Sequence, residues 1–353
     1  MKHEFICSAA EAARFLNTAL PEQCNAVEQL YPVQITPYYL NLIDRGDPSG
    51  DPVWKQCMPD AGELLDPDAS FDPLAEESQM PVSRVIHRFA DRIVLLSTGR
   101  CAVKCRFCFR KRTWRTGAEL PDISNQELED ACRYLKANAQ IHEVLISGGD
   151  PLMLSTYRMH EILKKLVSTG TISVIRIGSR VPVTWPERID TKLVSMLAGF
   201  DGLWLMTHFN HPAEVTAESA DACRKFIKAG IPVLNQTVLL RGVNDDAAVL
   251  EKLFRELIRI QVKPHYLFHV DPVRGVRHFA TGIEKGLEML RAFRPRLSSL
   301  AVPTFAIDLP EGGGKVALQP DYRCGDGFLS INGGKALKYP GPLPEQSGHT
   351  CSE

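Results

Sequence analysis

From residue 92 onward, short apolar runs alternate with longer segments of helical periodicity. The apolar runs have the length and β-branched content of buried strands, and they cover residues 92–97, 143–147, 174–178, 202–207, 233–240 and 264–270. The segments between them place apolar residues at the i, i+3, i+4, i+7 spacing of amphipathic helices, over residues 126–137, 157–168, 187–198, 216–229, 246–260 and 282–293. Six strand–helix units in series predict a parallel α/β fold, either an open doubly wound sheet or a barrel.

The two ends of the chain have a different texture. Residues 1–91 contain two helical patches and a segment rich in proline and aspartate, so we expect a helical N-terminal extension packed on the main domain. The strand–helix units form that domain over residues 92–300, and a further apolar run at 302–308 predicts a final strand within a segment over 301–340. Residues 341–353 are polar and rich in proline and glycine, and we expect a disordered tail.

The composition is that of a globular protein with no strong charge bias. Hydrophobic residues make up 44% and charged residues 24% of the 353 residues, and 41 basic against 42 acidic residues leave a net charge of −1. This balance gives no electrostatic reason to expect nucleic acid or anionic lipid as a partner. No apolar run reaches the roughly 18 residues of a membrane span, and charged residues near the start replace the apolar run of a signal peptide. We therefore expect a cytoplasmic protein whose ten cysteines are thiols or ligands.

Residues with chemical potential cluster where the predicted strands end. In a barrel the carboxyl ends of parallel strands share one rim, where functional groups gather. In strand order, the candidates are Cys101, then Gly148, Gly149 and Asp150, then Arg180, His208, Gln236 and Asp271.

Three cysteines fall within eight residues, as Cys101-x3-Cys105-x2-Cys108. This spacing differs from that of a structural zinc site, although a zinc clip with a distant fourth ligand is an alternative. Three thiolates suit a [4Fe–4S] cluster that leaves one iron open to a small chelating molecule. With Phe107 before the last cysteine, the motif resembles the signature of the radical S-adenosylmethionine (SAM) superfamily.

That resemblance gives the glycine-rich segment after the second strand a function. Gly148, Gly149 and Asp150 resemble the strand end that binds the amino group of SAM, and Arg180 could pair with the SAM carboxylate. Without the resemblance, a tight strand-to-helix turn would explain the glycines, and a surface ion pair would explain Arg180.

A lysine follows three glycines at Lys315. Such a lysine is placed to reach a carbonyl cofactor and form an imine. Lys335 also follows two glycines, but Lys315 comes after the predicted final strand, near the rim. Lys335 lies in a hairpin-like stretch, where we expect it to be exposed.

Eight segments together resemble the lysine 2,3-aminomutase family of radical SAM enzymes. They are TPYYL (36–40), HRFADR (87–92), CAVKCRFCFRKR (101–112), SGGDPL (147–152), RIGSRVPV (176–183), THFNHPAE (207–214), NQTVLLRGVND (235–245) and AVPTFAIDLPEGGGK (301–315). The resemblance implies a radical SAM partial (βα)6 barrel that binds a [4Fe–4S] cluster, SAM and pyridoxal 5′-phosphate (PLP). It also implies an isomerase in which a 5′-deoxyadenosyl radical starts the migration of an amino group, converting L-lysine to β-lysine.

The resemblance assigns roles to individual residues of this chain. Lys315 would bind PLP as an imine, Arg88 and Arg92 its phosphate, Arg110 the substrate carboxylate, Asp271 and Asp308 the side-chain ammonium of lysine, while His208 and Gln236 would lie near SAM. Taken alone, the arginines would be read as surface charges and the aspartates as turn residues. A metal pair formed by His208 and His211 is a weaker alternative, because no third ligand is evident.

Three other functions compete with this interpretation. Glutamate 2,3-aminomutase must receive an anionic side chain, which two acids would repel. A branch of the family that β-lysylates elongation factor P performs the same rearrangement, but tends to lose the Gly-Gly-Gly-Lys and the Asp308 context kept here. A non-catalytic iron–sulfur protein would have no use for Lys315.

The resemblance also bears on partners and on a second metal. It implies an electron donor such as flavodoxin or ferredoxin, and it leaves open a homo-oligomer. Longer family members carry a subunit-bridging zinc held by clustered cysteines. Only Cys324 and Cys351 remain in that region here, and Asp245 and Asp246 occupy the region of the partner cysteine, so we expect no such zinc.

Overall fold

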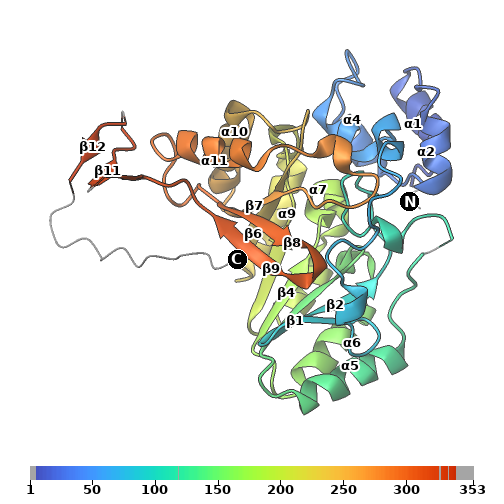
Figure 1. The fold of residues 1–353 in the computed structure, drawn as a ribbon. Helices are drawn as coiled ribbons and strands as arrows, with labels where there is room; N and C mark the ends of the chain where they lie inside the picture. Colours follow the sequence, from blue (N-terminus) through green and yellow to red (C-terminus); the bar gives the residue numbers. More distant parts are fainter. Residues whose placement is uncertain (1–4, 118, 326, 333, 339–353) are drawn as a thin grey trace.

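The computed structural model describes residues 5–338 except 118, 326 and 333. Within these residues, nine strands form one sheet in chain order (Figure 1). Strands β2 to β8 are parallel, whereas β1 and β9 pair antiparallel at the two edges. The strands are β1 (Val85–Phe89), β2 (Arg92–Thr98), β3 (Glu143–Gly148), β4 (Val174–Gly178), β5 (Leu203–Thr207), β6 (Val233–Leu239), β7 (Lys263–His269), β8 (Thr304–Leu309) and β9 (Gly314–Leu318).

Helices connect the parallel strands, as the periodicity predicts. They are α5 (Asn125–Ala137), α6 (Thr156–Val167), α7 (Val181–Thr184), α8 (Thr191–Leu197), α9 (Ala217–Lys228), α10 (Ala247–Arg259) and α11 (Ile283–Phe293). The helix expected over 187–198 is shorter, because the Asp190 carboxylate accepts from the Leu193 amide and starts α8 there. The preceding residues form a separate turn, η5 (Pro186–Arg188).

The sheet curves until its two edges approach each other. Arg88 on β1 lies 3.8 Å from the carboxylate of Asp308 on β8, and a Cβ added to Gly314 on β9 would lie 3.8 Å from the Phe89 ring. The predicted α/β fold with a partial barrel is therefore confirmed.

The inner face of this curved sheet is only partly covered. Fully buried and partly exposed residues alternate along β3, β4 and β6. The buried set, such as Ile146 and Ile177, belongs to the hydrophobic core shared with the helices. The partly exposed set, which includes Arg176 and Gln236, faces the inside, so the interior leaves room for ligands.

The N-terminal segment covers the carboxyl ends of the strands. Its helical elements are α1 (Ala9–Leu16), α2 (Cys24–Leu30), α3 (Pro37–Leu40), α4 (Pro52–Cys57), η1 (Ala61–Leu64) and η2 (Glu77–Gln79). This segment is hydrogen-bonded to the cysteine loop. The Lys104 amide donates to the Gln34 carbonyl and the Arg106 amide to the Gln56 carbonyl, each at 2.9 Å. Residues 85–89, at the end of the expected N-terminal extension, form strand β1, which the sequence analysis did not anticipate.

The C-terminal part forms a second, small sheet that stands apart from the barrel in Figure 1. Its strands are β10 (Arg323–Cys324), β11 (Gly327–Leu329) and β12 (Ala336–Leu337). The tail predicted to be disordered, 341–353, lies outside the described residues. None of the described helices has the length and apolar character needed to cross a membrane.

Candidate active site

The three clustered cysteines lie in the loop that leaves β2 at the carboxyl end of the barrel. Their thiols are free and half-buried, and burial raises the pKa of Cys101 and Cys105. Arg180 donates from Nη1 to the sulfur of Cys105 at 2.9 Å. Among the described residues, no three His, Cys, Asp or Glu side chains are arranged around a single metal ion. A four-iron cube binds each thiolate to a different iron, so three thiols on one loop beside a cation are a fitting donor set.

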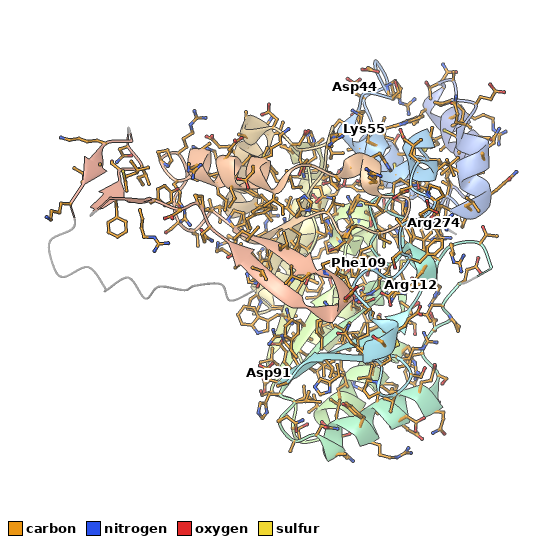
Figure 2. The ribbon with its side chains drawn as sticks, viewed as in Figure 1. Asp44, Lys55, Asp91, Phe109, Arg112 and Arg274 are labelled. Carbon is orange, nitrogen blue, oxygen red and sulfur yellow. The ribbon has the colours of Figure 1, made fainter. Side chains whose placement is uncertain are left out.

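A buried ion cluster anchors this loop. Arg106 donates to Glu63 from Nε at 2.9 Å and from Nη2 at 2.6 Å, and Lys111 donates to Glu63 at 2.6 Å. All three side chains have no exposed surface. Lys111 also donates to the Gly275 carbonyl at 2.6 Å, which joins the cysteine loop to the loop after β7. The neighbouring Arg274 and Arg112 lie on the same side of the molecule in Figure 2.

Gly148 and Gly149 are required by a close approach of two backbones. A Cβ on Gly148 would lie 2.3 Å from the Thr98 carbonyl oxygen, and one on Gly149 would lie 2.4 Å from that of Arg100. Gly148 also has a φ of +126°, a region that favours glycine. This packing explains the glycines without a ligand, so SAM binding by the segment stays a prediction.

The Asp150 side chain ties the end of β3 to the end of β4. Its carboxylate accepts from the Ser179 hydroxyl at 2.7 Å and from the amides of Arg180 and Val181 at 2.7 and 3.1 Å. Asp150 is thereby committed to bonds within the protein and orients Arg180, rather than pointing a free carboxylate at a ligand.

Arg180 is buried at the centre of a polar network. Its Nη2 lies 2.6 Å from Glu214 and 2.6 Å from the Gln56 side-chain oxygen, and its Nε donates to the His208 carbonyl at 3.2 Å. With Nη1 on Cys105, each guanidinium nitrogen has a partner within the protein. The structure therefore places Arg180 beside the predicted cluster, and its pairing with a SAM carboxylate stays a prediction.

His208 directly follows β5 and Gln236 lies in the neighbouring strand β6, and the His208 ring contacts the cysteine loop. The His208 ring is 5.4 Å from the Phe107 ring, and its Nε2 lies 3.0 Å from the Asn210 side-chain oxygen. Burial, and then the charge of Arg180, lower the pKa of His208 to about 3, so the ring is neutral. Gln236 is half-buried on the inner face of β6.

Lys315 lies directly opposite Asp308 in the β8–β9 hairpin. Gly312 and Gly314 have φ values of +79° and +87°, so the glycine run forms the tight turn that brings the two strands together. The Lys315 amine lies 2.6 Å from an Asp308 oxygen and 3.9 Å from the centre of the Phe268 ring. Burial lowers the pKa of Lys315, which increases the neutral, nucleophilic fraction of this amine.

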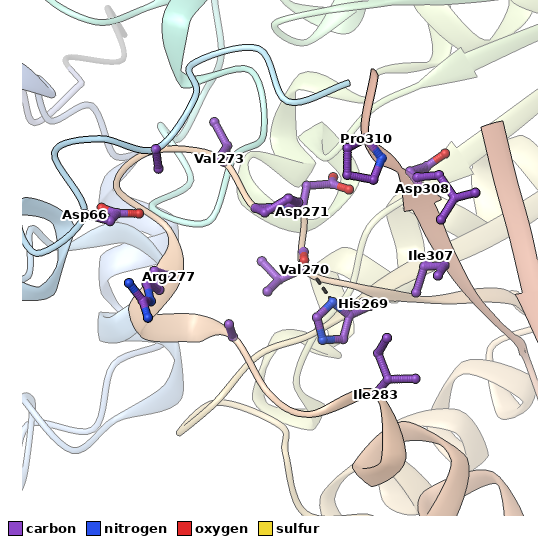
Figure 3. A pocket seen from close by; sticks show the side chains of 14 residues that line it. Asp66, His269, Val270, Asp271, Val273, Arg277, Ile283, Ile307, Asp308 and Pro310 are labelled. Atoms are coloured by element: carbon purple, nitrogen blue, oxygen red, sulfur yellow. Dashed lines mark hydrogen bonds between the residues drawn. The ribbon is translucent and has the colours of Figure 1, made fainter. Parts of the chain in front are cut away.

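Asp271, at the end of β7, shares this corner with Asp308. Burial, and then the charge of Asp308, raise the pKa of Asp271 to about 7, while Lys315 acts in the opposite direction. Figure 3 shows the two carboxylates on either side of Pro310, at one end of a cavity of about 340 Å³. The structure thus brings both predicted ammonium-binding acids to the predicted PLP lysine.

The two predicted phosphate-binding arginines have different surroundings. Arg88 lies within the site, 3.8 Å from Asp308, with its side chain 12% exposed. Arg92 lies at the hairpin between β1 and β2, where it pairs with Asp91 at 2.7 Å and covers the Phe89 ring at 3.9 Å. The structure brings Arg88 to Lys315 and leaves Arg92 at the edge of the site.

Arg110, the predicted carboxylate-binding residue, is buried beside the inner face of β3. Its Nη1 donates to the Ser147 hydroxyl at 3.0 Å. Its other side meets Glu76, with Nη2 2.7 Å from one oxygen and Nε 2.9 Å from the other.

The sequence analysis missed three residues of the site, Glu76, Glu63 and Phe268. The run of cations after the cysteines was a signal for the two acids, because buried cations need anionic partners.

Comparisons with known proteins agree with this geometry. A family model described as the radical SAM superfamily matches residues 95–253, and one described as lysine-2,3-aminomutase matches residues 287–327. A putative L-lysine 2,3-aminomutase of Aquifex aeolicus is 44% identical over 310 residues, which cover 86% of this chain and 82% of that protein. The L-lysine 2,3-aminomutase of Clostridium subterminale is 43% identical over 289 residues, covering 82% and 69% of the two chains.

A glutamate 2,3-aminomutase of Clostridioides difficile is more distant, at 38% identity over 308 residues that cover 86% of this chain and 72% of that protein. The predicted family is confirmed by these relatives and by the two family models. The chain belongs to the lysine 2,3-aminomutase family of radical SAM enzymes.

Proposed function

We propose that this protein interconverts L-lysine and β-lysine as an L-lysine 2,3-aminomutase. The observation that carries the proposal is the corner formed by Lys315, Asp308 and Asp271. There, a half-buried amine with a lowered pKa lies beside two carboxylates that complement the ammonium of a lysine side chain.

The residues present fit the three groups that the family uses. Cys101, Cys105 and Cys108 would hold a [4Fe–4S] cluster at which SAM would bind, and Lys315 with Arg88 and Arg92 would hold PLP. When bound, these groups supply a carbon radical and an electron-accepting ring, the chemistry needed to move an amino group between adjacent carbons.

The protein's own part is to bind, orient and exclude water. Phe268 and Tyr266 stack on the inner face and lie 3.9 and 5.4 Å from the Lys315 amine, which favours a flat aromatic ligand there. Arg110 would take the substrate carboxylate at one end, and Asp271 with Asp308 would take the ammonium at the other. Fixing both ends orients the carbon chain between them.

The same acids select lysine over glutamate. A glutamate side chain would bring a third carboxylate to Asp271 and Asp308. The two cations nearest Asp308, Lys315 at 2.6 Å and Arg88 at 3.8 Å, are both assigned to PLP. Paired like charges in a partly buried site are strongly unfavourable, so lysine should be the preferred substrate.

A competition experiment tests this choice. Reconstituted protein with SAM, PLP and dithionite should convert L-lysine to β-lysine when equal amounts of L-lysine and L-glutamate are supplied. Preferential formation of β-glutamate would refute the substrate assignment. Asp308→Asn is the matched variant, because it keeps the shape of the site and should lose much of the preference for lysine.

We also propose a cytoplasmic setting and a one-electron donor such as flavodoxin or ferredoxin. The nine cysteines of the described residues are free, as a reducing compartment would leave them. Cluster chemistry of this class needs a supply of single electrons. Cluster reduction by either carrier in a purified system, with dithionite as the reference reductant, tests the donor.

A further inference from the structure

Glu76 makes two ion pairs deep within the site. It belongs to the segment before β1 and is 3% exposed. Its carboxylate lies across Arg110, at 2.7 and 2.9 Å, and also accepts from Arg112 at 2.8 Å. Burial alone would raise the pKa of Glu76, but Arg110 and Arg112 outweigh burial and hold it at about 2. Glu76 is therefore an anion at all working pH values.

The hydrogen bonds of Arg110 to Glu76 and Ser147 leave two of its N–H donors free to bind a ligand. This group carries five N–H donors in a rigid plane. Glu76 uses the Nε donor and one on Nη2, and Ser147 uses one on Nη1. One donor on each of Nη1 and Nη2 remains, and two such donors match the two oxygens of a carboxylate.

The segment that carries Glu76 also holds the cofactor side of the site. The Leu74 carbonyl accepts from Arg88 Nη2 at 2.9 Å, and the Gln79 side-chain oxygen accepts from Arg88 Nε at 2.8 Å. The Pro73 carbonyl accepts from the Glu311 amide at 2.9 Å, in the turn that precedes Lys315. One short segment therefore contacts Arg110, Arg88 and the lysine hairpin.

We propose that Glu76 is a positioning residue for substrate recognition. By holding the Nε–Nη2 side of Arg110, it turns the remaining donors of Nη1 and Nη2 toward the α-carboxylate of the amino-acid substrate. This inference rests on the proposed function, because it takes Arg110 as the carboxylate-binding group.

The test compares L-lysine with L-lysinamide, which lacks the carboxylate charge. Both are titrated by calorimetry into protein loaded with cluster, SAM and PLP, without a reductant, so that binding is measured without turnover. Wild-type protein should prefer lysine over lysinamide. In Glu76→Gln that preference should fall by about 10- to 100-fold, the effect of charge-assisted hydrogen bonds, mostly through weaker lysine binding.

Two further variants keep the test decisive. Glu77→Gln is the matched control, because this neighbouring acid is 71% exposed and contacts Arg112 at 3.2 Å; it should keep the wild-type preference. Glu76→Asp keeps the buried charge, and so the fold, but shortens the side chain by one carbon, and should also lose part of the preference.

Two results would overturn the inference. One is an unchanged preference in both Glu76 variants. The other is an equal loss of lysine and lysinamide binding, which would show a general structural role only. Failure of wild-type protein to bind lysine at all would refute the proposed function itself, and this inference with it.

Discussion

Replacing Glu63 with glutamine should destabilise the protein severely. The substitution keeps the volume of the side chain but removes the only carboxylate that the structure pairs with Arg106 and Lys111 among the described residues. None of the three side chains has exposed surface, so water cannot solvate the two cations that the substitution leaves unpaired. Breaking a buried pair in this way costs about 3–5 kcal/mol.

The expected loss converts into a measurable change in melting temperature. A chain of 353 residues has an unfolding entropy equivalent to roughly 0.7 kcal/mol per degree, so the loss corresponds to a decrease of about 4–7 °C. Anaerobic calorimetry of wild type and Glu63→Gln measures it. Asp130→Asn is the control, because Asp130 pairs with Arg133 at 2.7 Å on the surface, and its loss should lower the melting temperature by about 1 °C or less.

A melting temperature of Glu63→Gln within about 1 °C of wild type would refute the reasoning. It would mean that the buried cations find other partners or release their protons. Lys111 is the group that could do so, because burial lowers its pKa to about 8. Lys111, in the buried ion cluster, joins the cysteine loop to the loop after β7. We therefore also expect Glu63→Gln to retain less iron after reconstitution.

Three further predictions concern the site. Because Asp271 has a pKa of about 7 and pairs with an ammonium only when deprotonated, kcat/KM for lysine should fall about tenfold per pH unit below that value; Asp271→Asn should lack this limb. Lys315→Ala should abolish the imine absorbance of added PLP, whereas the exposed Lys335→Ala should retain it, and the reverse result would reassign the lysine. Arg88→Ala and Arg92→Ala should each lower PLP affinity about tenfold or more; equilibrium dialysis showing unchanged affinity would remove that arginine from the phosphate site.

Periodicity predicted the series of strand–helix units well, because most of them have a regular apolar pattern. It left an open sheet and a barrel as alternatives, and the partial barrel came from the family resemblance. Strand β1 escaped prediction, since its five residues include His87 and Arg88 and its pairing with β2 is set by the hairpin. Helix α8 starts later than predicted because Asp190 caps it, and a capping residue inside a periodic segment is easily taken for a surface position.

The site was predicted where a motif or a chain turn fixes it. The three glycines pointed to Lys315 as the imine-forming lysine, and the structure shows that they form the turn that sets Lys315 opposite Asp308. Glu63 and Glu76 could not be found in this way, because their partners lie more than 30 residues away along the chain and no spacing rule connects them. Their contacts follow from tertiary packing alone.

The most direct measurement asks whether the cysteine loop and Lys315 act together on one substrate. Anaerobically reconstituted wild type, given L-lysine, SAM, PLP and dithionite, should form β-lysine that mass spectrometry detects. Cys105→Ser and Lys315→Ala should each form none. Absence of β-lysine with wild-type protein that holds its iron and PLP, or its persistence in either variant, would contradict a shared active site in the barrel.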